Sequence, residues 1–469
     1  MFLRTLLAAM VLAVPALAQP VAVPDCTVDV SVASTLKLEV VYRCRSTTAL
    51  SFAPDDQEVA SHVSGYRFAR VEPVNGLVEA RYRYDLADYA RTVNSTREGI
   101  KRGDAVLAPI PGWLLEPRGF ERLPLIDIRV QLPEGFAFAT GLPKVGDAWR
   151  LAGTRVGFAG YSAIGKFALE EIAVPAPGSL RPGAPRQDGV LRLAVLDGFA
   201  KGSTPDLVDW VRRTAQAAAN YWQGFTARQM MIGLVPMQRP GVGYGRSVSG
   251  GGATVMVEVG ATVDLRRLFN DWVLVHELIH TGMPFVRGRG TWLMEGAATY
   301  VEPIIRARAG WKTEEEVWKE WVDNMPRGVA AFANGLANAS GQQNYWAGAT
   351  FMLMADIGIR RSTAGAKGLE DCLGGALWSG LDAPQTVRVT DYAAACDRAT
   401  GTKLMSELVD RYRGAQPVDL SALWKDLGVA KVGDRIVLDD SAPSAKWRKM
   451  IVTGPPSRPT PHVKLPWES

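Results

Sequence analysis

The chain has 469 residues, of which 47% are hydrophobic and 22% are charged, so a disordered or fibrous protein is excluded. The 53 Lys and Arg residues against 48 Asp and Glu residues give a formal net charge of +5, with no long basic run. A nucleic-acid-binding protein would concentrate its positive charge in one stripe, so we expect no nucleic-acid partner. At roughly 150 residues per domain, the length predicts about three domains.

Residues 1–18 have the pattern of a secretory signal peptide. Arg4 supplies a positive start, an apolar run follows, and Ala16-Leu17-Ala18 matches the small-x-small motif that precedes cleavage. The apolar run is too short to span a bilayer, and no later segment offers 18 uninterrupted apolar residues. We therefore expect an exported protein, periplasmic or secreted, with no stable membrane insertion. The sequence assigns no oligomeric state.

Residues 19–185 are predicted to form a β-rich, sandwich-like domain. Polar and apolar residues alternate in segments that are separated by turns rich in Gly, Pro, Asn and Asp: 27–32, 36–42, 78–84 and 126–132. Such alternation places every second side chain on one buried face, as in a β-sandwich. The proline-rich stretch 175–185 then predicts a linker to the next domain.

Residues 186–310 are predicted to form a mixed lobe of strands and helices. A helix begins at Thr204-Pro205, with proline in its first turn, and ends near Trp222. Three apolar or alternating segments indicate strands: 190–196, 230–235 and 253–259. A glycine-rich stretch leads into the last of these strands.

The pattern becomes mostly helical after Asp264. We expect a helical lobe over residues 311–427 and a carboxyl-terminal tail of short strands and irregular structure over residues 428–469. The tryptophan-rich helix 314–323 is predicted to pack by one face rather than to contact a membrane.

The four cysteines form an even count, which is informative in an exported protein. Of the three possible pairings, the local one is the simplest: Cys26 with Cys44, and Cys372 with Cys396. The alternative is that some of these cysteines are reduced and buried. No C-x-x-C pair occurs, so we do not expect a cysteine-ligated zinc site.

His276, Glu277 and His280 form an H-E-x-x-H motif. Positions i and i+4 share one face of a helix, so both imidazoles can bind one metal ion. Glu277 lies beside them, where it can act as a base towards a water molecule. We expect the helix that carries the motif to begin after Asp264 and to be stopped by Pro284.

Glu295 is the candidate third ligand, in a helix that Thr291 is expected to cap. A two-His, one-Glu set is a common catalytic zinc site, because it leaves one position open. Thr299 lies four positions later on the same helix face, so its hydroxyl could orient a histidine ligand. The alternative for Glu295 is a surface carboxylate on an amphipathic helix.

Two segments resemble known metallopeptidases. Residues 292–300, with the sequence W-L-M-E-G-A-A-T-Y, resemble the third-ligand helix of the gluzincin metallopeptidases. Residues 345–360, which begin Y-W-A-G-A-T, resemble the catalytic-tyrosine helix of the glycyl aminopeptidase family within that group. Residues 82–115 also resemble the β-domain of that family, so the similarity covers most of residues 80–427.

The resemblance implies an α+β multidomain fold with a β-sandwich-like domain before a thermolysin-like catalytic domain. It also implies that one zinc ion is bound by His276, His280 and Glu295. Glu277 would be the general base, and Tyr345 would donate a hydrogen bond to the oxyanion of the reaction. The substrate would be a peptide or an unfolded protein segment.

The chain departs from the family at a glycine-rich segment. Aminopeptidases of this kind place a Gly-Gly-x-Glu-like segment on the strand at the cleft edge, where its Glu holds the free amine of the substrate. Here Gly251, Gly252, Ala253 and Thr254 occupy that segment, with Thr254 where the Glu is expected. We expect these residues to bind the peptide as an added strand.

The missing Glu leaves two peptidase types open, an aminopeptidase and an endopeptidase of the same fold. A non-catalytic, zinc-stabilised peptide-binding protein is the alternative from another class. Arg287 and Arg289 lie between the two ligand helices, where they either bind a substrate carboxylate or are simply exposed to solvent.

Overall fold

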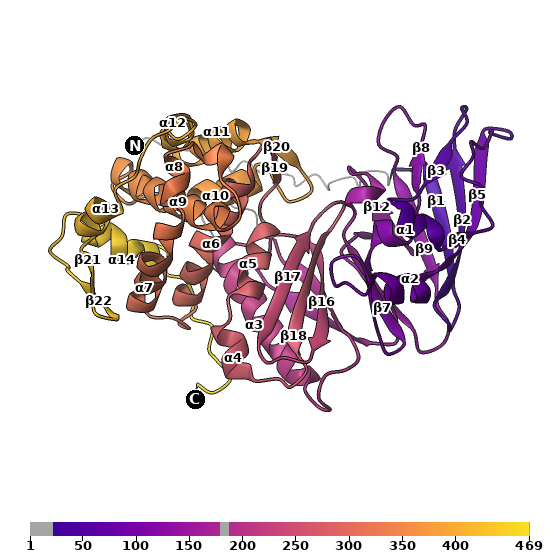
Figure 1. Cartoon of the computed structure of the whole chain (residues 1–469), viewed down its shortest axis with the longest axis horizontal. Coiled ribbons are helices and arrows are strands. Elements are labelled where there is room, and N and C mark those ends of the chain that lie inside the picture. Colours follow the sequence, from indigo (N-terminus) through magenta and orange to yellow (C-terminus); the bar gives the residue numbers. More distant parts are fainter. Residues whose placement is uncertain (1–21, 179–186, 469) are drawn as a thin grey trace, which may run out of the picture.

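The structure is a computed structural model that describes residues 22–178 and 187–468. The predicted signal peptide, residues 1–18, lies outside the described residues. The described chain forms three parts in a row: a β-rich part, a central five-stranded sheet with its helices, and a helical lobe (Figure 1). Within the described residues, no helix combines the length and the apolar character that crossing a membrane requires.

The β-rich part contains two main sheets that share one hydrophobic core. Side chains of both sheets meet in this core, among them Val28, Val106 and Ile164. The first sheet has the order β11 (Lys144–Val145), β12 (Ala148–Leu151), β9 (Ile126–Gln131), β1 (Cys26–Val32), β2 (Lys37–Arg45), β5 (Leu77–Asp85), β4 (Val63–Ser64). The second has the order β10 (Ala137–Thr140), β13 (Tyr161–Gly165), β7 (Ala105–Pro109), β6 (Ile100–Arg102). The four strands predicted from alternation are confirmed as β1, β2, β5 and β9.

Shorter elements complete this part of the chain. They are β3 (Ser51–Ala53) paired with β8 (Glu116–Arg118), the helices α1 (Gln57–Ser61) and α2 (Leu86–Val93), and the 3₁₀ turns η1 (Ile110–Gly112) and η2 (Val156–Phe158). The predicted pairing of Cys26 with Cys44 is confirmed, because these residues face each other in the β1–β2 ladder and form a disulfide.

The boundary predicted at residue 185 is wrong. Strand β14 (Ala168–Val174) does not belong to the β-rich part, because it pairs with β15 (Gly189–Val195) at the edge of the central sheet. Strands β14 and β15, on either side of the predicted linker, are therefore neighbours in one sheet, and residues 179–186 of that linker lie outside the described residues. The boundary lies between β13 and β14. A local sequence pattern can indicate that β14 is a strand. It does not indicate with which strand β14 pairs, and that pairing decides to which sheet β14 belongs.

The central sheet has the order β14-β15-β16-β18-β17. Strands β15, β16 (Gln229–Met237) and β18 (Ala253–Gly260) are parallel, and β17 (Val242–Val248) is an antiparallel edge strand. Neighbouring residues of one strand face opposite ways. Ile232 and Val255 therefore pack with the helix α3 (Thr204–Trp222), whereas Met231 and Met256 pack against Tyr161 of the β-rich part.

Two helices replace the single helix expected after Asp264. Helix α4 (Leu265–Asn270) ends, the chain becomes extended at Asp271, and α5 (Val273–His280) begins. Asp271 Oδ1 accepts a hydrogen bond of 2.8 Å from the backbone N–H of Val273, so the side chain of Asp271 starts the second helix. Helix α5 ends before Pro284, which therefore does not terminate it.

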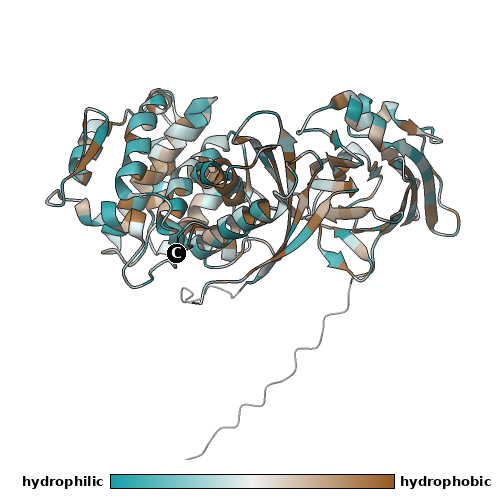
Figure 2. Ribbon diagram, turned by 90° about the horizontal axis from the view of Figure 1, so that it is seen from below, coloured by the Kyte–Doolittle hydropathy of each residue, from teal (hydrophilic) through white to brown (hydrophobic). Residues whose placement is uncertain are grey.

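The helical lobe is built around α6 (Thr291–Arg308) and α9 (Gln342–Ser362). Its other elements are α7 (Glu314–Asn324), η3 (Met325–Arg327), α8 (Val329–Phe332), η4 (Leu336–Asn338), α10 (Leu369–Trp378), α11 (Val389–Thr400), α12 (Leu404–Arg411) and α13 (Leu420–Leu427). In Figure 2, hydrophobic (brown) and hydrophilic (teal) residues alternate along many of these helices, as in helices with one buried face. The second predicted disulfide is also confirmed, since Cys372 of α10 is bonded to Cys396 of α11.

Two features of the lobe were not predicted. Strands β19 (Phe285–Arg287) and β20 (Thr386–Arg388) form a short parallel pair beside the central sheet. In residues 428–469 the expected short strands are β21 (Val429–Val432) and β22 (Arg435–Leu438), whereas the helix α14 (Ala445–Thr453) was not expected. Arg448 of α14 is fully buried, and its Nε donates a hydrogen bond of 2.8 Å to Glu314 of α7. This segment is therefore part of the lobe.

Candidate metal centre

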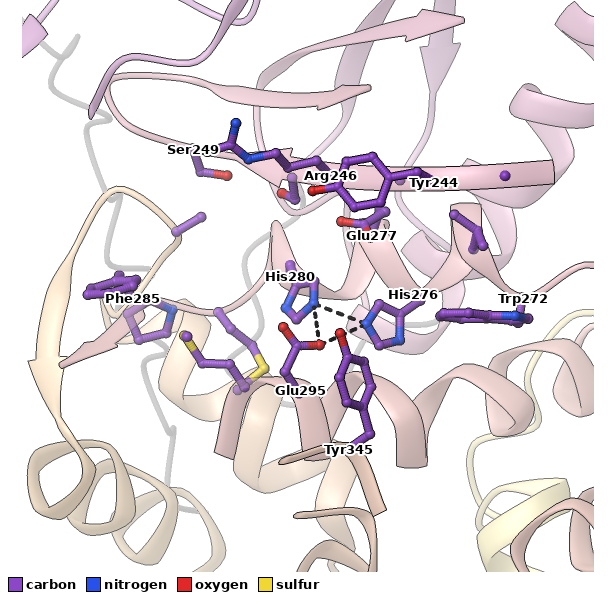
Figure 3. A pocket seen from close by; sticks show the side chains of 18 residues that line it. Tyr244, Arg246, Ser249, Trp272, His276, Glu277, His280, Phe285, Glu295 and Tyr345 are labelled. Carbon is purple, nitrogen blue, oxygen red and sulfur yellow. Dashed lines mark hydrogen bonds and ion pairs between the residues drawn. The ribbon is translucent and has the colours of Figure 1, made fainter. Parts of the chain in front are cut away.

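The three predicted ligands converge on one point (Figure 3). Helix α5 supplies His276 and His280 from successive turns, and α6 supplies Glu295 from its first turns. His276 Nε2 lies 3.2 Å from Glu295 Oε2 and 3.2 Å from His280 Nε2. His280 Nε2 lies 3.5 Å from Glu295 Oε2. One atom from each residue thus forms a nearly equilateral triangle.

The dimensions of this triangle fit a zinc ion. Ligand atoms that lie about 2.0–2.1 Å from a tetrahedral zinc ion are separated from one another by roughly 3.3–3.4 Å. The observed separations of 3.2, 3.2 and 3.5 Å match that spacing. Two imidazole nitrogens and one carboxylate oxygen are also the ligand types that zinc prefers. His276, His280 and Glu295 could therefore hold the ion and leave one position open.

The electrostatics of the triangle favour a positive charge at its centre. Burial alone would raise the pKa of Glu295, but hydrogen bonds and charges from His276 and His280 hold that pKa well below its usual range. Burial alone would lower the pKa of His280, but its hydrogen bond to Glu295 and the charges of Glu295 and Glu277 raise it. The carboxylate stays ionised and favours a positive charge on His280, and a divalent cation at the centre of the triangle would supply that charge instead.

Glu277 lies on α5 between the two histidines and lines the same cavity. It is held under the edge strand β17, which approaches α5 closely. A methyl group at Gly245 would lie 2.6 Å from Val273 Cγ1 and 2.7 Å from Glu277 Cγ. Glycine at this position therefore allows the strand to cover Glu277 on one side while its carboxylate faces the cavity.

Tyr345 lies at the start of α9 and lines the cavity opposite β17. Its ring stacks on the ring of His276, with 5.9 Å between centroids and 21° between planes. Burial, followed by the negative charges of Glu295 and Glu277, raises the pKa of Tyr345 to about 12. The hydroxyl therefore stays protonated at neutral pH and can donate a hydrogen bond.

Thr299 does not make the contact that was expected of it. Its side chain is buried on α6, but within the described residues neither its Oγ1 nor His276 Nδ1 has a hydrogen-bond partner. The structure therefore shows no hydroxyl from Thr299 that orients a histidine ligand.

The cavity has a volume of about 480 Å³. Its lining includes His276, Glu277, His280, Glu295 and Tyr345, together with Gly243 to Ser247 of β17. Three exposed aromatic side chains also line it: Tyr244 of β17, Trp272 and Phe285. These aromatic residues lie around the candidate metal ligands and give the cavity an apolar surface. Arg287 and Arg289 instead line a neighbouring cavity, where Arg289 donates a hydrogen bond of 2.7 Å to Asn338.

The glycine-rich segment expected at the cleft edge lies elsewhere. Strand β18 is covered by β16 on one side and by β17 on the other, so the edge strand is β17. Thr254 is buried, and its Oγ1 accepts a 3.0 Å hydrogen bond from the backbone N–H of Tyr161. A methyl group at Gly252 would lie 2.2 Å from the carbonyl oxygen of Gly141. The segment Gly251-Gly252-Ala253-Thr254 therefore contacts the β-rich part and does not line the cavity as expected.

Comparison with known proteins identifies the fold. No protein-family sequence profile matches the chain, and no curated protein matches its sequence. The structure of an aminopeptidase N family protein from Idiomarina loihiensis matches with a TM-score of 0.61 and 14% identity over 86% of this chain and 78% of that chain. An aminopeptidase A from Legionella pneumophila in complex with aspartic acid matches with a TM-score of 0.51 and 10% identity, over 84% of this chain and 49% of that chain. At this identity the likeness concerns the fold: the chain has the mixed α/β multidomain fold of the aminopeptidase N family, as its gluzincin motifs predicted.

Proposed function

We propose that the protein is an exported zinc metallopeptidase that hydrolyses peptide bonds. The observation that carries this proposal is the triangle of His276, His280 and Glu295 at zinc-ligand spacing, with Glu277 and Tyr345 in the same cavity. The likeness to the fold of the aminopeptidase N family also supports the proposal. A fold alone does not assign an activity, so the proposal rests mainly on the residues of the site.

Each residue of the site has a distinct role in the proposed reaction. When bound, zinc supplies a Lewis acid that polarises the scissile carbonyl and makes a water molecule more acidic. Glu277 takes a proton from the attacking water and passes it to the departing amine. Tyr345, protonated at neutral pH, donates a hydrogen bond to the carbonyl oxygen as negative charge develops there.

Export is supported by the two disulfides, because such bonds persist in oxidising compartments. The signal-peptide pattern of residues 1–18 points in the same direction. Purified mature protein from its native host should begin at Gln19, which amino-terminal sequencing would check.

We further propose that cleavage does not require the free amine of the substrate. The acidic side chains that line the cavity, within the described residues, are Glu277 and Glu295. Both already have roles, so no carboxylate remains to pair with an α-amine. Cleavage within a chain is therefore favoured over trimming from its amino end. Peptides with a free and an acetylated amine should be cleaved at similar rates, whereas loss of cleavage on acetylation would establish an aminopeptidase.

The test of the proposed function is the substitution Glu277→Gln. This variant should bind zinc in a 1:1 ratio, measured by elemental analysis, and should show no cleavage of a broad peptide library by mass spectrometry. Glu315→Gln, on the exposed face of α7, is the matched control and should retain full activity. Full activity of Glu277→Gln would contradict the proposal. Zinc binding without any cleavage by the parent protein would favour the peptide-binding alternative.

A further inference from the structure

Arg246 places a positive charge in the cavity wall. It lies on the edge strand β17. Among the described residues that line this cavity, Arg246 is the single Lys or Arg residue. Tyr244 lies two positions earlier on the strand, so both side chains extend from the same face of β17. Figure 3 shows the two side chains next to each other above the metal ligands.

The β-rich part of the protein holds the guanidinium in place. Arg246 Nη1 donates a hydrogen bond of 3.0 Å to the carbonyl oxygen of Arg97 and one of 3.4 Å to the hydroxyl of Tyr161. Tyr161 in turn donates a hydrogen bond of 3.1 Å to the same carbonyl of Arg97. The guanidinium carbon also lies 6.0 Å from the centroid of the Tyr161 ring. Two segments that are distant in sequence therefore fix one side chain of the cavity.

The anchoring leaves the charge of Arg246 without a counterion. Both acceptors are neutral oxygens, and no Asp or Glu of the described chain forms an ion pair with Arg246. The bonds to Arg97 and Tyr161 use Nη1 alone. No described residue accepts a hydrogen bond from Nε or Nη2, the two nitrogens that form one edge of the guanidinium. That edge binds carboxylates through two parallel hydrogen bonds.

We propose that Arg246 binds a carboxylate of the peptide substrate, either an acidic side chain or the terminal carboxylate. This inference rests on the proposed peptidase function and names the substrate class of that site. A carboxylate would complete the hydrogen bonds of the guanidinium, whereas a free amine near Arg246 would be repelled. The preference is therefore for substrates that carry a negative charge to one side of the scissile bond.

The experiment uses the zinc-loaded protein and matched fluorogenic hexapeptides. In one series a single Glu or Gln is moved through every position of an otherwise neutral sequence. In a second series the peptide ends in a free carboxylate or in an amide. The variants are Arg246→Gln, which removes the charge, and Arg246→Glu, which reverses it. Arg239→Gln removes an exposed arginine that pairs with Glu258 outside this cavity and is the matched control.

The expected result is a preference of about tenfold in kcat/KM, mainly through KM, for Glu over Gln at one position or for the free carboxylate over the amide. The first outcome identifies a side-chain carboxylate and the second a terminal one. Arg246→Gln should remove the preference, Arg246→Glu should reverse it in favour of the Gln or amide peptide, and Arg239→Gln should behave as the parent does.

Two outcomes separate this inference from the proposed function. If the parent cleaves the peptides with no preference for a carboxylate, or if Arg246→Gln retains the preference, the role of Arg246 is wrong and the peptidase stands. Calorimetric titration of the same peptide pairs into zinc-loaded Glu277→Gln measures binding without cleavage. If the parent cleaves nothing, equal binding within both pairs, Glu against Gln and free carboxylate against amide, would overturn the inference. About tenfold tighter binding of the carboxylate member of either pair would sustain it.

Discussion

Gly296 of α6 and Gly348 of α9 pack backbone against backbone. A methyl group at Gly296 would lie 2.2 Å from Gly348 Cα, and one at Gly348 would lie 2.0 Å from the carbonyl oxygen of Trp292. Glu295 directly precedes the first glycine, and Tyr345 lies about one turn before the second. The close approach of these two helices therefore sets the distance between the proposed third ligand and the proposed oxyanion donor.

Gly348→Ala should destabilise the protein and lower its activity. The added methyl group overlaps rigid backbone, so the helices must separate, at a cost of about 1–3 kcal/mol in the free energy of unfolding. The separation would also move Tyr345 away from the ligands and lower kcat. Urea denaturation and peptide cleavage measure the two effects. Gly414→Ala is the control, because no atom lies within 4 Å of a methyl group there.

Tyr345→Phe should lower kcat on the order of 10²-fold while KM and zinc content stay close to those of the parent. The substitution removes one hydroxyl donor at the position of developing negative charge and preserves the ring that stacks on His276. Steady-state kinetics with elemental analysis would check it. Tyr412→Phe removes a hydroxyl elsewhere in the same lobe and should leave kcat unchanged. An equal fall in both variants would assign the effect to packing.

Removal of zinc should lower the melting temperature by several degrees. A ligand that binds only the folded chain stabilises it by about 4 kcal/mol at a thousandfold excess over its dissociation constant. Glu295→Gln replaces one of the three proposed ligands, so the melting temperature of that variant should respond little to a chelator. Thermal unfolding with and without a chelator compares the two proteins. A full chelator response in Glu295→Gln would remove Glu295 from the ligand set.

Glu302 should make the stability of the protein fall as the pH rises. Burial, partly offset by the charge of Arg306, raises the pKa of Glu302 from 4.5 to about 7. Between these values the folded state binds a proton that the unfolded state has lost, so the free energy of unfolding decreases as pH increases, by on the order of 3 kcal/mol in all. Denaturation at pH 5 and pH 8, with chelator present throughout, should show a smaller decrease for Glu302→Gln than for the parent. Equal decreases would contradict this assignment.

Loss of the disulfide between Cys372 and Cys396 should destabilise the helical lobe. The bond closes a loop with a sequence separation of 24 residues, and the chain-entropy relation gives about 3.5 kcal/mol for a loop of that length. The double variant Cys372→Ala/Cys396→Ala should therefore unfold at a lower denaturant concentration but retain zinc. Retention of the parent's midpoint would show that packing of α10 on α11 suffices without the bond.

The elements that the sequence predicted well are those with strong local patterns. Helix α3 has the predicted bounds Thr204–Trp222, because proline in its first turn and a regular apolar face mark it clearly. Strand β17 was not predicted, since Gly243 and Gly245 interrupt its alternation, and of these two glycines Gly245 lies against α5. The break before α5 was also missed, because an Asp that starts a new helix resembles an ordinary polar residue within one long helix.

The sequence by itself determined the candidate ligand pair, since the spacing of His276 and His280 on any helix places both imidazoles on one face. It also favoured the two local disulfides, and its resemblance to the gluzincin metallopeptidases implied the candidate roles of Glu295 and Tyr345. Only the tertiary structure decided which strand borders the cavity and that Arg246 lies in its wall. The physical reason is that strand order and the contact with the β-rich part depend on packing between segments that are far apart in the chain. A local periodicity in the sequence does not indicate which distant segments pack together.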